Sequence, residues 1–232
     1  MQTNNNLILI AKNKKLKIIH IIILVIGAIF MIGSGLHTNI WFDETYTVGL
    51  VNHSFVDIAK IGAADVHPLF YYMFAKFFTL FTGNSIISLR MFSVIGMICL
   101  SLLGYTHIRK DFGEKTGIIY SFLIMFLPVT LLYSSEIRMY SWAAVLVTLT
   151  GIYAYRIIRK ESNIKNWILF GLFSLLSAYT HYFAMMAIGI INIMLFAYTI
   201  KNKKYIKEFL ITGISQIVLF IPRIDSIFKA ST

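Results

Sequence analysis

Two adjacent carboxylates, Asp43 and Glu44, are the residues of this sequence best suited to acid–base chemistry. They lie between Trp41-Phe42 and Tyr46, just after a long apolar segment. A carboxylate can serve as a general base towards a hydroxyl, and an acidic neighbour can orient it or help to hold a cation. Charged groups are costly to place near hydrocarbon, so such residues usually have a functional role. The other interpretation is a solvated pair of loop residues with no chemical role.

A second stretch, Asp65-Val66-His67-Pro68, comes directly before an aromatic segment. Proline is common at the first position of a helix, so we expect a helix to begin here with Asp65 as its cap. His67 has no comparable structural explanation. We expect it to face the same side of the protein as Asp43.

A third stretch runs from Tyr133 to Trp142 and contains Glu136, Arg138 and Tyr140. If it is extended, these three side chains point to one side; if it is helical, Arg138 points away from the other two. A fixed arginine here would suit an anionic head group, because a guanidinium matches the geometry of a phosphate. The other interpretation is a local ion pair beside an interfacial tyrosine.

Two further candidates, His181 and Arg223, are single residues at breaks in apolar segments. The histidine lies within Tyr179-Thr180-His181-Tyr182, where it can also be a hydrogen-bonded structural residue of a helix junction. Arg223 follows Pro222 and can also be an interfacial anchor. No spacing of histidine, cysteine and carboxylate residues is a strong metal-ligand signature, so cofactors are unknown and a divalent cation stays an open alternative.

The elements that must position these side chains are transmembrane helices. The chain of 232 residues is 58% hydrophobic and 13% charged, against about 45–50% and about 25% in soluble proteins. Six windows of at least 14 residues contain no charged residue: 18–42, 91–108, 116–135, 139–155, 166–200 and 209–222. The window 166–200 is too long for one crossing of a hydrocarbon core of about 30 Å, so we expect a break near 178–183. The prediction is an all-α polytopic membrane protein with about seven transmembrane helices.

Segment 66–89 decides which loops share a side of the membrane. If it does not cross, 15 of the 21 basic residues and four acids fall on one side, and the other side has no net charge. Basic loops are typical of the cytoplasmic side, so the net charge of +11 is an orientation signal and gives no support to nucleic-acid binding. We expect residues 1–17 to be a cytoplasmic basic N-terminus and 18–223 a transmembrane module, whose outer loop 37–89 contains an aromatic interfacial helix at 68–82.

With this topology, the candidate residues lie on the extracytoplasmic face of a multi-pass protein of the cell membrane. A site at the edge of a bilayer, without a soluble domain, suits a lipid-embedded substrate. Group transfer from a lipid-linked phosphate to a hydroxyl needs a carboxylate base, a cation for the departing phosphate and a groove for the lipid tail. Asp43 would supply the base and Arg138 the cation, and the aromatic helix would line the groove or stack on a sugar.

Four motifs occur in an order that matches a known family. They are Asp43-Glu44, the Asp-x-His-Pro-Leu-x-Tyr-Tyr run from Asp65 to Tyr72, Ser135-Glu136-Ile137-Arg138-Met139-Tyr140, and Tyr179-Thr180-His181-Tyr182-Phe183. Over nearly its whole length the chain resembles the polyprenyl-phosphate-sugar-dependent glycosyltransferases of the GT-C fold, relatives of the protein O-mannosyltransferases and the lipid A aminoarabinose transferase. The resemblance implies an inverting transfer of a sugar from a polyprenyl-phosphate donor to a hydroxyl of a glycan, lipid or protein at the extracytoplasmic face.

The resemblance also implies roles for single residues. Asp43 would be the catalytic base, Glu44 its neighbour in the site and Arg138 a contact to the donor phosphate. The other substrate-binding residues would be His67, Glu136, Tyr140, His181 and Arg223.

Members of this family usually continue further, so residues 224–232 are expected to be a truncated C-terminal end of the module. One alternative hypothesis is therefore a non-catalytic remnant or assembly subunit of such an enzyme. Another, from a different class, is a small transporter or flippase. Transport pathways usually place ionisable residues in mid-span, whereas the predicted spans here are essentially uncharged.

Overall fold

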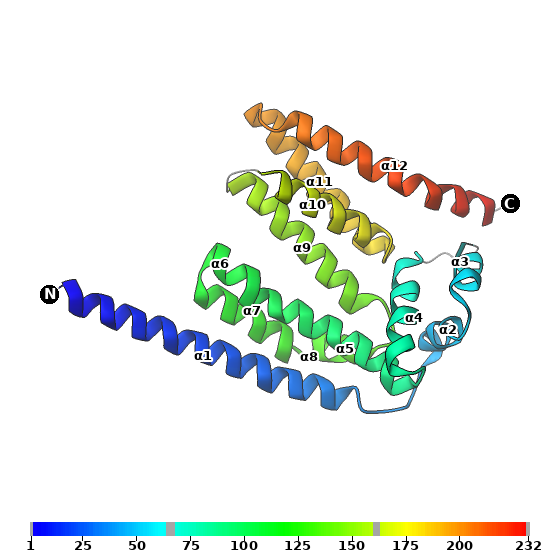
Figure 1. The fold of residues 1–232 in the computed structure, drawn as a ribbon, viewed down its shortest axis with the longest axis horizontal. Helices are drawn as coiled ribbons and strands as arrows, with labels where there is room; N and C mark the ends of the chain where they lie inside the picture. Colours follow the sequence, from blue (N-terminus) through cyan, green and yellow to red (C-terminus); the bar gives the residue numbers. More distant parts are fainter. Residues whose placement is uncertain (1, 64–67, 160–162, 231–232) are drawn as a thin grey trace.

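The computed structural model describes residues 2–63, 68–159 and 163–230, and every regular element in these ranges is a helix (Figure 1). The longer helices run back and forth and pack against one another. They are α1 Gln2–Ser34, α5 Ile86–Leu103, α7 Glu114–Phe126, α9 Tyr140–Arg159, α10 Ile164–Ala178, α11 Tyr182–Asn202 and α12 Ile206–Ala230. The predicted all-α architecture is confirmed.

Among the described residues, four helical segments are long and apolar enough to cross a membrane. They are Asn13–Ser34, Ile86–Phe112, Tyr140–Arg159 and Tyr182–Asn202. A fifth is added if α7 and α8 (Pro128–Ser135) form one bent span, and α10 is apolar but only 15 residues long. The chain is a multi-pass membrane protein, and the figure of about seven crossings stays a prediction.

The uncharged window 116–135 forms two helices, α7 and α8, that meet at an angle of 61°. Leu127 is extended, with φ −67° and ψ 133°, and Pro128 begins α8. Proline has no N–H for a continuing helix, and it disfavours helical backbone at the residue before it. The single crossing expected here is therefore sharply bent.

The break expected near 178–183 is confirmed. The helix α10 ends at Ala178 and α11 begins at Tyr182. His181 caps α11, since its Nδ1 accepts a hydrogen bond from the backbone N–H of Phe183 at 3.1 Å.

Three short helices gather at one end of the bundle, which we call the site end: α2 Phe42–Leu50, α3 Phe55–Ala63 and α4 Phe70–Thr82 (Figure 1). The helix α4 occupies most of the predicted interfacial segment and runs across the ends of the longer helices (Figure 1). It packs on α5, and the backbone N–H of its first residue, Phe70, donates to the carbonyl of Tyr179 at 3.0 Å. This bond ties α4 to the α10–α11 junction.

The rings of α4 are divided between the protein interior and the surface. Tyr71 and Tyr72 are buried in a core cluster with Phe92 of α5, whereas Phe77 and Phe81 are exposed. The aromatic residues of this helix therefore serve packing as well as the surface.

The described basic clusters lie at the opposite end of the bundle, which we call the basic end. They occupy the first half of α1, the short helix α6 (Arg109–Phe112), the end of α9 and the α11–α12 link (Figure 1). The helices thus separate these clusters from the site end, as the charge count requires.

Within the basic end, α1 is joined to α7 by buried polar contacts. His20 is fully buried, with Nε2 2.8 Å from the Ser121 hydroxyl and Nδ1 3.4 Å from Glu114 Oε1. Beside it, α5 continues into a π-helical turn, Gly104–Ile108. A Cβ on Gly104 would lie 2.7 Å from the carbonyl oxygen of Gly117, so only glycine permits this close approach of the two helices.

Candidate functional site

The site end is organised by Arg90 near the start of α5. The residue is only 2% exposed. Its Nη1 and Nη2 donate to the two carboxylate oxygens of Glu44 at 2.8 and 2.9 Å, which is a two-pronged ion pair. Bidentate arginine–carboxylate pairs combine charge with fixed geometry.

The remaining donors of Arg90 bind backbone carbonyls of two other segments. Its Nε donates to the carbonyl of His37 at 3.1 Å, and Nη2 donates to the carbonyl of Asn39. Nη1 also donates to the carbonyl of Ser135, the last residue of α8. One arginine therefore joins α5, the link between α1 and α2, and the end of α8.

Sequence reasoning did not single out Arg90. The residue directly precedes the uncharged window 91–108 and marks the start of a predicted span. The signal that could have found it is a basic residue at the first turns of an apolar helix, on the same predicted face as Asp43 and Glu44. Such a cation near hydrocarbon needs a partner.

Glu44 is 1% exposed, and hydrogen bonds occupy both of its carboxylate oxygens. Besides Arg90, Oε1 accepts from the backbone N–H of Ile137 at 2.8 Å and Oε2 from that of Trp41 at 3.2 Å. The bond to Trp41 closes the first turn of α2, and the bond to Ile137 reaches the α8–α9 link. In this structure Glu44 connects elements and has no oxygen left for a substrate proton.

Asp43 is in a different state, although it is the adjacent residue. Its side chain is partly exposed, and its carboxylate accepts no hydrogen bond from the described part of the chain. Its backbone carbonyl accepts a hydrogen bond from Arg138 Nη1 at 3.1 Å. Among the described residues, the Asp43 carboxylate is thus unpaired, while a hydrogen bond fixes the backbone that carries it.

The link between α8 and α9 carries the predicted acid and arginine. Arg138 is 6% exposed, and its neighbours Ile137 and Met139 are buried in the core cluster beneath α4. The structure therefore brings Arg138 to Asp43, as predicted from the loop positions. The arginine does not form the local ion pair with Glu136 that was the other interpretation.

Glu136 is half-buried, and within the described residues its Oε2 is buried without a hydrogen-bond partner. Burial, and after it the negative charge of Glu44, raise the pKa of the Glu136 carboxyl above its ordinary value. Groups with such shifts in an open site are candidates for proton transfer or substrate contact.

Tyr140 and His181 meet beside this link. Their ring centroids are 5.8 Å apart in an edge-on contact, and Tyr140 makes a second edge-on contact with Tyr133 at 5.1 Å. His181 is also the cap of α11. This histidine therefore has the structural role considered for it, and it also contacts Tyr140. The start of α9 and the α10–α11 junction are thus in contact beside the α8–α9 link.

Two of the predicted residues are not placed as side chains. His67 lies outside the described residues, as does Asp65. Arg223 lies in α12, directly after Pro222, and its side chain is not part of the described structure. Their roles stay predictions.

The sequence leaves a divalent cation as an open alternative. Among the side chains that the structure describes, no three from histidine, cysteine, aspartate or glutamate form a group that could hold a metal ion. Of the acidic residues at the site, Glu44 already has Arg90 as its counter-ion.

A family model described as dolichyl-phosphate-mannose-protein mannosyltransferase matches residues 66–224, which is more than half of the chain. The matched region runs from the start of the α4 segment into α12 and includes Arg90, Arg138 and His181. Neither the curated proteins nor the solved structures gave a match.

Proposed function

Because the chain belongs to the dolichyl-phosphate-mannose-protein mannosyltransferase family, we propose that it transfers a sugar from a polyprenyl-phosphate donor to a hydroxyl of a glycan, lipid or protein. The family consists of membrane glycosyltransferases, which agrees with the apolar helices of the chain. The observation that carries the proposal is the contrast between two adjacent carboxylates. Glu44 is ion-paired with Arg90, whereas the Asp43 carboxylate accepts no hydrogen bond from the described residues and its backbone carbonyl accepts one from Arg138.

In the proposed reaction, Asp43 is the general base. Its carboxylate takes the proton of the acceptor hydroxyl while the hydroxyl oxygen attacks the anomeric carbon of the donor sugar. The bond between that carbon and the phosphate oxygen breaks, and polyprenyl phosphate leaves with the bonding electrons. Attack from the face opposite the phosphate inverts the configuration at this carbon.

The departing phosphate gains negative charge, which a nearby fixed cation stabilises. Arg138 is the proposed cation, because its guanidinium lies against the backbone of Asp43. Glu44 is a positioning residue in this scheme: through Trp41 it closes the turn that carries Asp43, and through Ile137 it holds the link that carries Arg138.

The residues around this pair are proposed to contact the substrates. Glu136 and Tyr140 lie on the same link as Arg138 or directly after it, and His181 contacts Tyr140. His67 and Arg223 are proposed to contribute from the segments on which they lie. We assign no cofactor to the reaction.

The proposed location of the site is the extracytoplasmic face of the cell membrane, with the N-terminus in the cytoplasm. Support comes from the position of the described basic clusters at the end of the bundle opposite to α2, α3 and α4. Loops rich in lysine and arginine are retained on the cytoplasmic side.

The decisive test is Asp43→Asn in the purified full chain, assayed with polyprenyl-phosphate sugars and hydroxyl acceptors. Removing the base is expected to lower turnover at least about a hundredfold, while insertion and accumulation in the membrane stay normal. The matched control is Asp57→Asn in α3, whose carboxylate accepts a hydrogen bond from Ser54 at the surface. Unchanged turnover of Asp43→Asn would remove Asp43 from the role of base. Donor binding by the wild type without any turnover would favour the non-catalytic alternative.

A further inference from the structure

A groove with a volume of about 320 Å³ lies on the surface of the bundle between α10 and α12. Its sides are exposed apolar residues, which include Ile168 and Leu172 of α10 and Ile211 and Leu219 of α12. Trp167 also lines the groove and is only 3% exposed. On a membrane protein, an exposed apolar groove is a surface on which a lipid chain can pack.

The groove follows the two helices over a length close to half the thickness of a membrane. On α10 its lining begins at Ile164, the first residue of the helix, and ends at Leu175. These two residues are about 16 Å apart along a helix that rises about 1.5 Å per residue. One leaflet makes up half of a hydrocarbon core of about 30 Å, so the groove has the length of a lipid chain within one leaflet.

One end of the groove lies beside the lysine-rich link between α11 and α12, at the basic end. Residues 201–208 contain four lysines and one acid, Glu208. Lys207 is exposed and lies one helical turn before Ile211, on the side of α12 that lines the groove. Tyr205 of this link makes a ring contact with Trp167, with centroids 6.4 Å apart. Tyrosine and tryptophan favour the level of the lipid headgroups, so the lysines lie where a lipid phosphate would be.

We propose that this groove binds one chain of an anionic phospholipid from the leaflet at the basic end, with the phosphate at the lysines of the α11–α12 link. The proposal does not depend on the glycosyl transfer. Basic pockets between membrane helices are suited to acidic headgroups, and the apolar sides of the groove are suited to the chain. A second transmembrane helix does not fit, because a helix is about 10–12 Å across and a 16 Å length of it has several times the volume of the groove.

The polar side chains that line the groove do not oppose this occupant. The hydroxyl of Ser215 donates to the carbonyl of Ile211 in its own helix at 2.8 Å. The Nε2 of Gln216 has no hydrogen-bond partner among the described residues, but protein atoms already bury it. A lipid chain in the groove therefore removes no further water from this donor.

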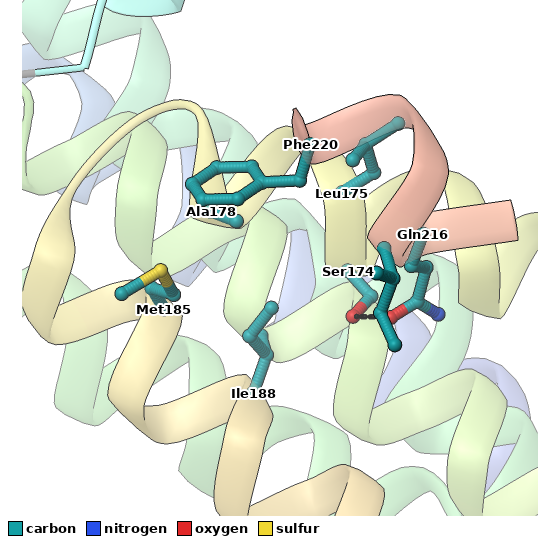
Figure 2. A pocket seen from close by; sticks show the side chains of 8 residues that line it. Ser174, Leu175, Ala178, Met185, Ile188, Gln216 and Phe220 are labelled. Carbon is teal, nitrogen blue, oxygen red and sulfur yellow. Dashed lines mark hydrogen bonds between the residues drawn. The ribbon is translucent and has the colours of Figure 1, made fainter. Parts of the chain in front are cut away.

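A smaller groove, of about 190 Å³ between α10, α11 and α12, adjoins the first (Figure 2). Leu175 and Gln216 line both grooves, and the amide oxygen of Gln216 accepts a hydrogen bond from Ser174 at 3.1 Å (Figure 2). The smaller groove continues to Ala178 and Phe220, away from the lysine-rich link. It therefore lacks the cations that would hold an acidic headgroup.

The headgroup assignment is tested by native mass spectrometry of the purified full chain with dioleoyl phosphatidylglycerol or dioleoyl phosphatidylcholine. The first phosphatidylglycerol molecule is expected to bind at least about tenfold more tightly than phosphatidylcholine. The double variant Lys204→Gln, Lys207→Gln is expected to lower phosphatidylglycerol affinity at least about tenfold. The matched control is Lys110→Gln, an exposed lysine of α6 at the same end, with an expected change of less than about twofold. Equal affinity for the two lipids would overturn the headgroup assignment.

The chain assignment is tested with Ser215→Phe, which fills the groove from α12. It is expected to lower the affinity for phosphatidylglycerol at least about tenfold, while Ile214→Phe, at an exposed neighbour that does not line the groove, leaves it unchanged. Phosphatidylglycerol with a photoreactive group at the end of one chain is expected to label peptides of α10 and α12.

Three results would overturn the chain assignment. They are binding that Ser215→Phe leaves unchanged, labelling spread evenly over the helices, and a dimer that Ser215→Phe dissociates without loss of lipid. The last result would assign the groove to a second copy of the chain. Sugar transfer enters none of these measurements, so a failure of the proposed function leaves the test of the groove intact.

Discussion

At the scale of single residues, the site depends on the different surroundings of two neighbouring acids. Glu44 points into the bundle, where Arg90 and two backbone N–H groups occupy its oxygens. Asp43 is partly exposed, and no hydrogen bond to its carboxylate comes from the part of the chain that the structure describes. This division of roles follows from helix geometry, since adjacent residues of a helix point about 100° apart and meet different neighbours.

Arg90 and Glu44 are both buried, so a variant that removes one charge of this ion pair should destabilise the fold more than a variant that removes both. Arg90→Met leaves Glu44 charged and unpaired in the interior and is expected to lower the unfolding free energy by about 3–5 kcal/mol. The double variant Arg90→Met, Glu44→Gln removes the charge and keeps an acceptor for Ile137. It is expected to recover most of this loss. Thermal unfolding in detergent measures both, and a double variant less stable than the single one contradicts the expectation.

Glu136 should make stability depend on pH. Because burial raises its pKa in the folded chain, the folded state binds this proton more tightly than the unfolded state does. The contribution is therefore complete below the ordinary pKa of 4.5 and is lost as pH rises through the raised value. Glu136→Gln lacks this titration, so the stability of the wild type should fall relative to the variant across this window. Unfolding curves of both proteins at a series of pH values check it, and a constant offset between them would show that Glu136 does not contribute.

At the scale of elements, short helices and bends bring the site residues together. The helix α2 holds Asp43, α8 ends where Arg90 reaches the carbonyl of Ser135, and α4 is tied to the α10–α11 junction. The short helices α2 and α4 do not need to cross the membrane, and α8 is the second half of the bent pair that it forms with α7. They lie where the long helices end, because irregular backbone is tolerated at such positions and not in contact with lipid.

The bend at Pro128 is expected to be needed for activity and not for stability. Pro128→Ala restores an N–H donor and lets α7 continue, which moves α8 and the Glu136–Met139 link that follows it. Turnover should fall by about tenfold to a hundredfold, while the unfolding temperature stays equal or rises. The control is Leu127→Ala, a change at an exposed neighbouring side chain that keeps the proline. Loss of stability in Pro128→Ala, or full activity, would separate the bend from the site.

At the scale of the whole molecule, the helices place the described basic clusters at one end and the candidate site at the other (Figure 1). A direct hydrogen bond joins Arg138 to the backbone of Asp43, so α2 and the α8–α9 link must lie on the same side of the bilayer. The buried contacts of His20 with Ser121 and Glu114 hold the opposite end of the first span.

The orientation can be tested with single cysteines, since Cys99 is the one native cysteine of the sequence. In a Cys99→Ser background, Val56→Cys in α3 and Lys110→Cys in α6 introduce exposed thiols at the two ends of the molecule. A maleimide that does not cross membranes should label position 56 in intact cells and position 110 only after permeabilisation. The reverse pattern would place the site on the cytoplasmic side, and labelling of both positions in intact cells would contradict the threading of the chain.

The sequence by itself determined the helical membrane architecture, the break between α10 and α11, and the candidate set that includes Asp43, Arg138 and His181. These features follow from local properties: runs without charge, capping residues and the chemistry of single side chains. The bend before Pro128 had a local cause too, although the absence of charge in 116–135 concealed it.

Only the tertiary structure decided which of the two adjacent acids is buried in an ion pair. Arg90 lies 46 positions after Glu44, and the N–H of Ile137 lies 93 positions after it. Both bonds form because the bundle packs α5 and the α8–α9 link against α2, and no pattern of neighbouring residues encodes that packing. The same packing creates a groove beside Tyr140 that is lined by residues of α5, α7, α8 and α9. No single segment of the sequence reveals this groove.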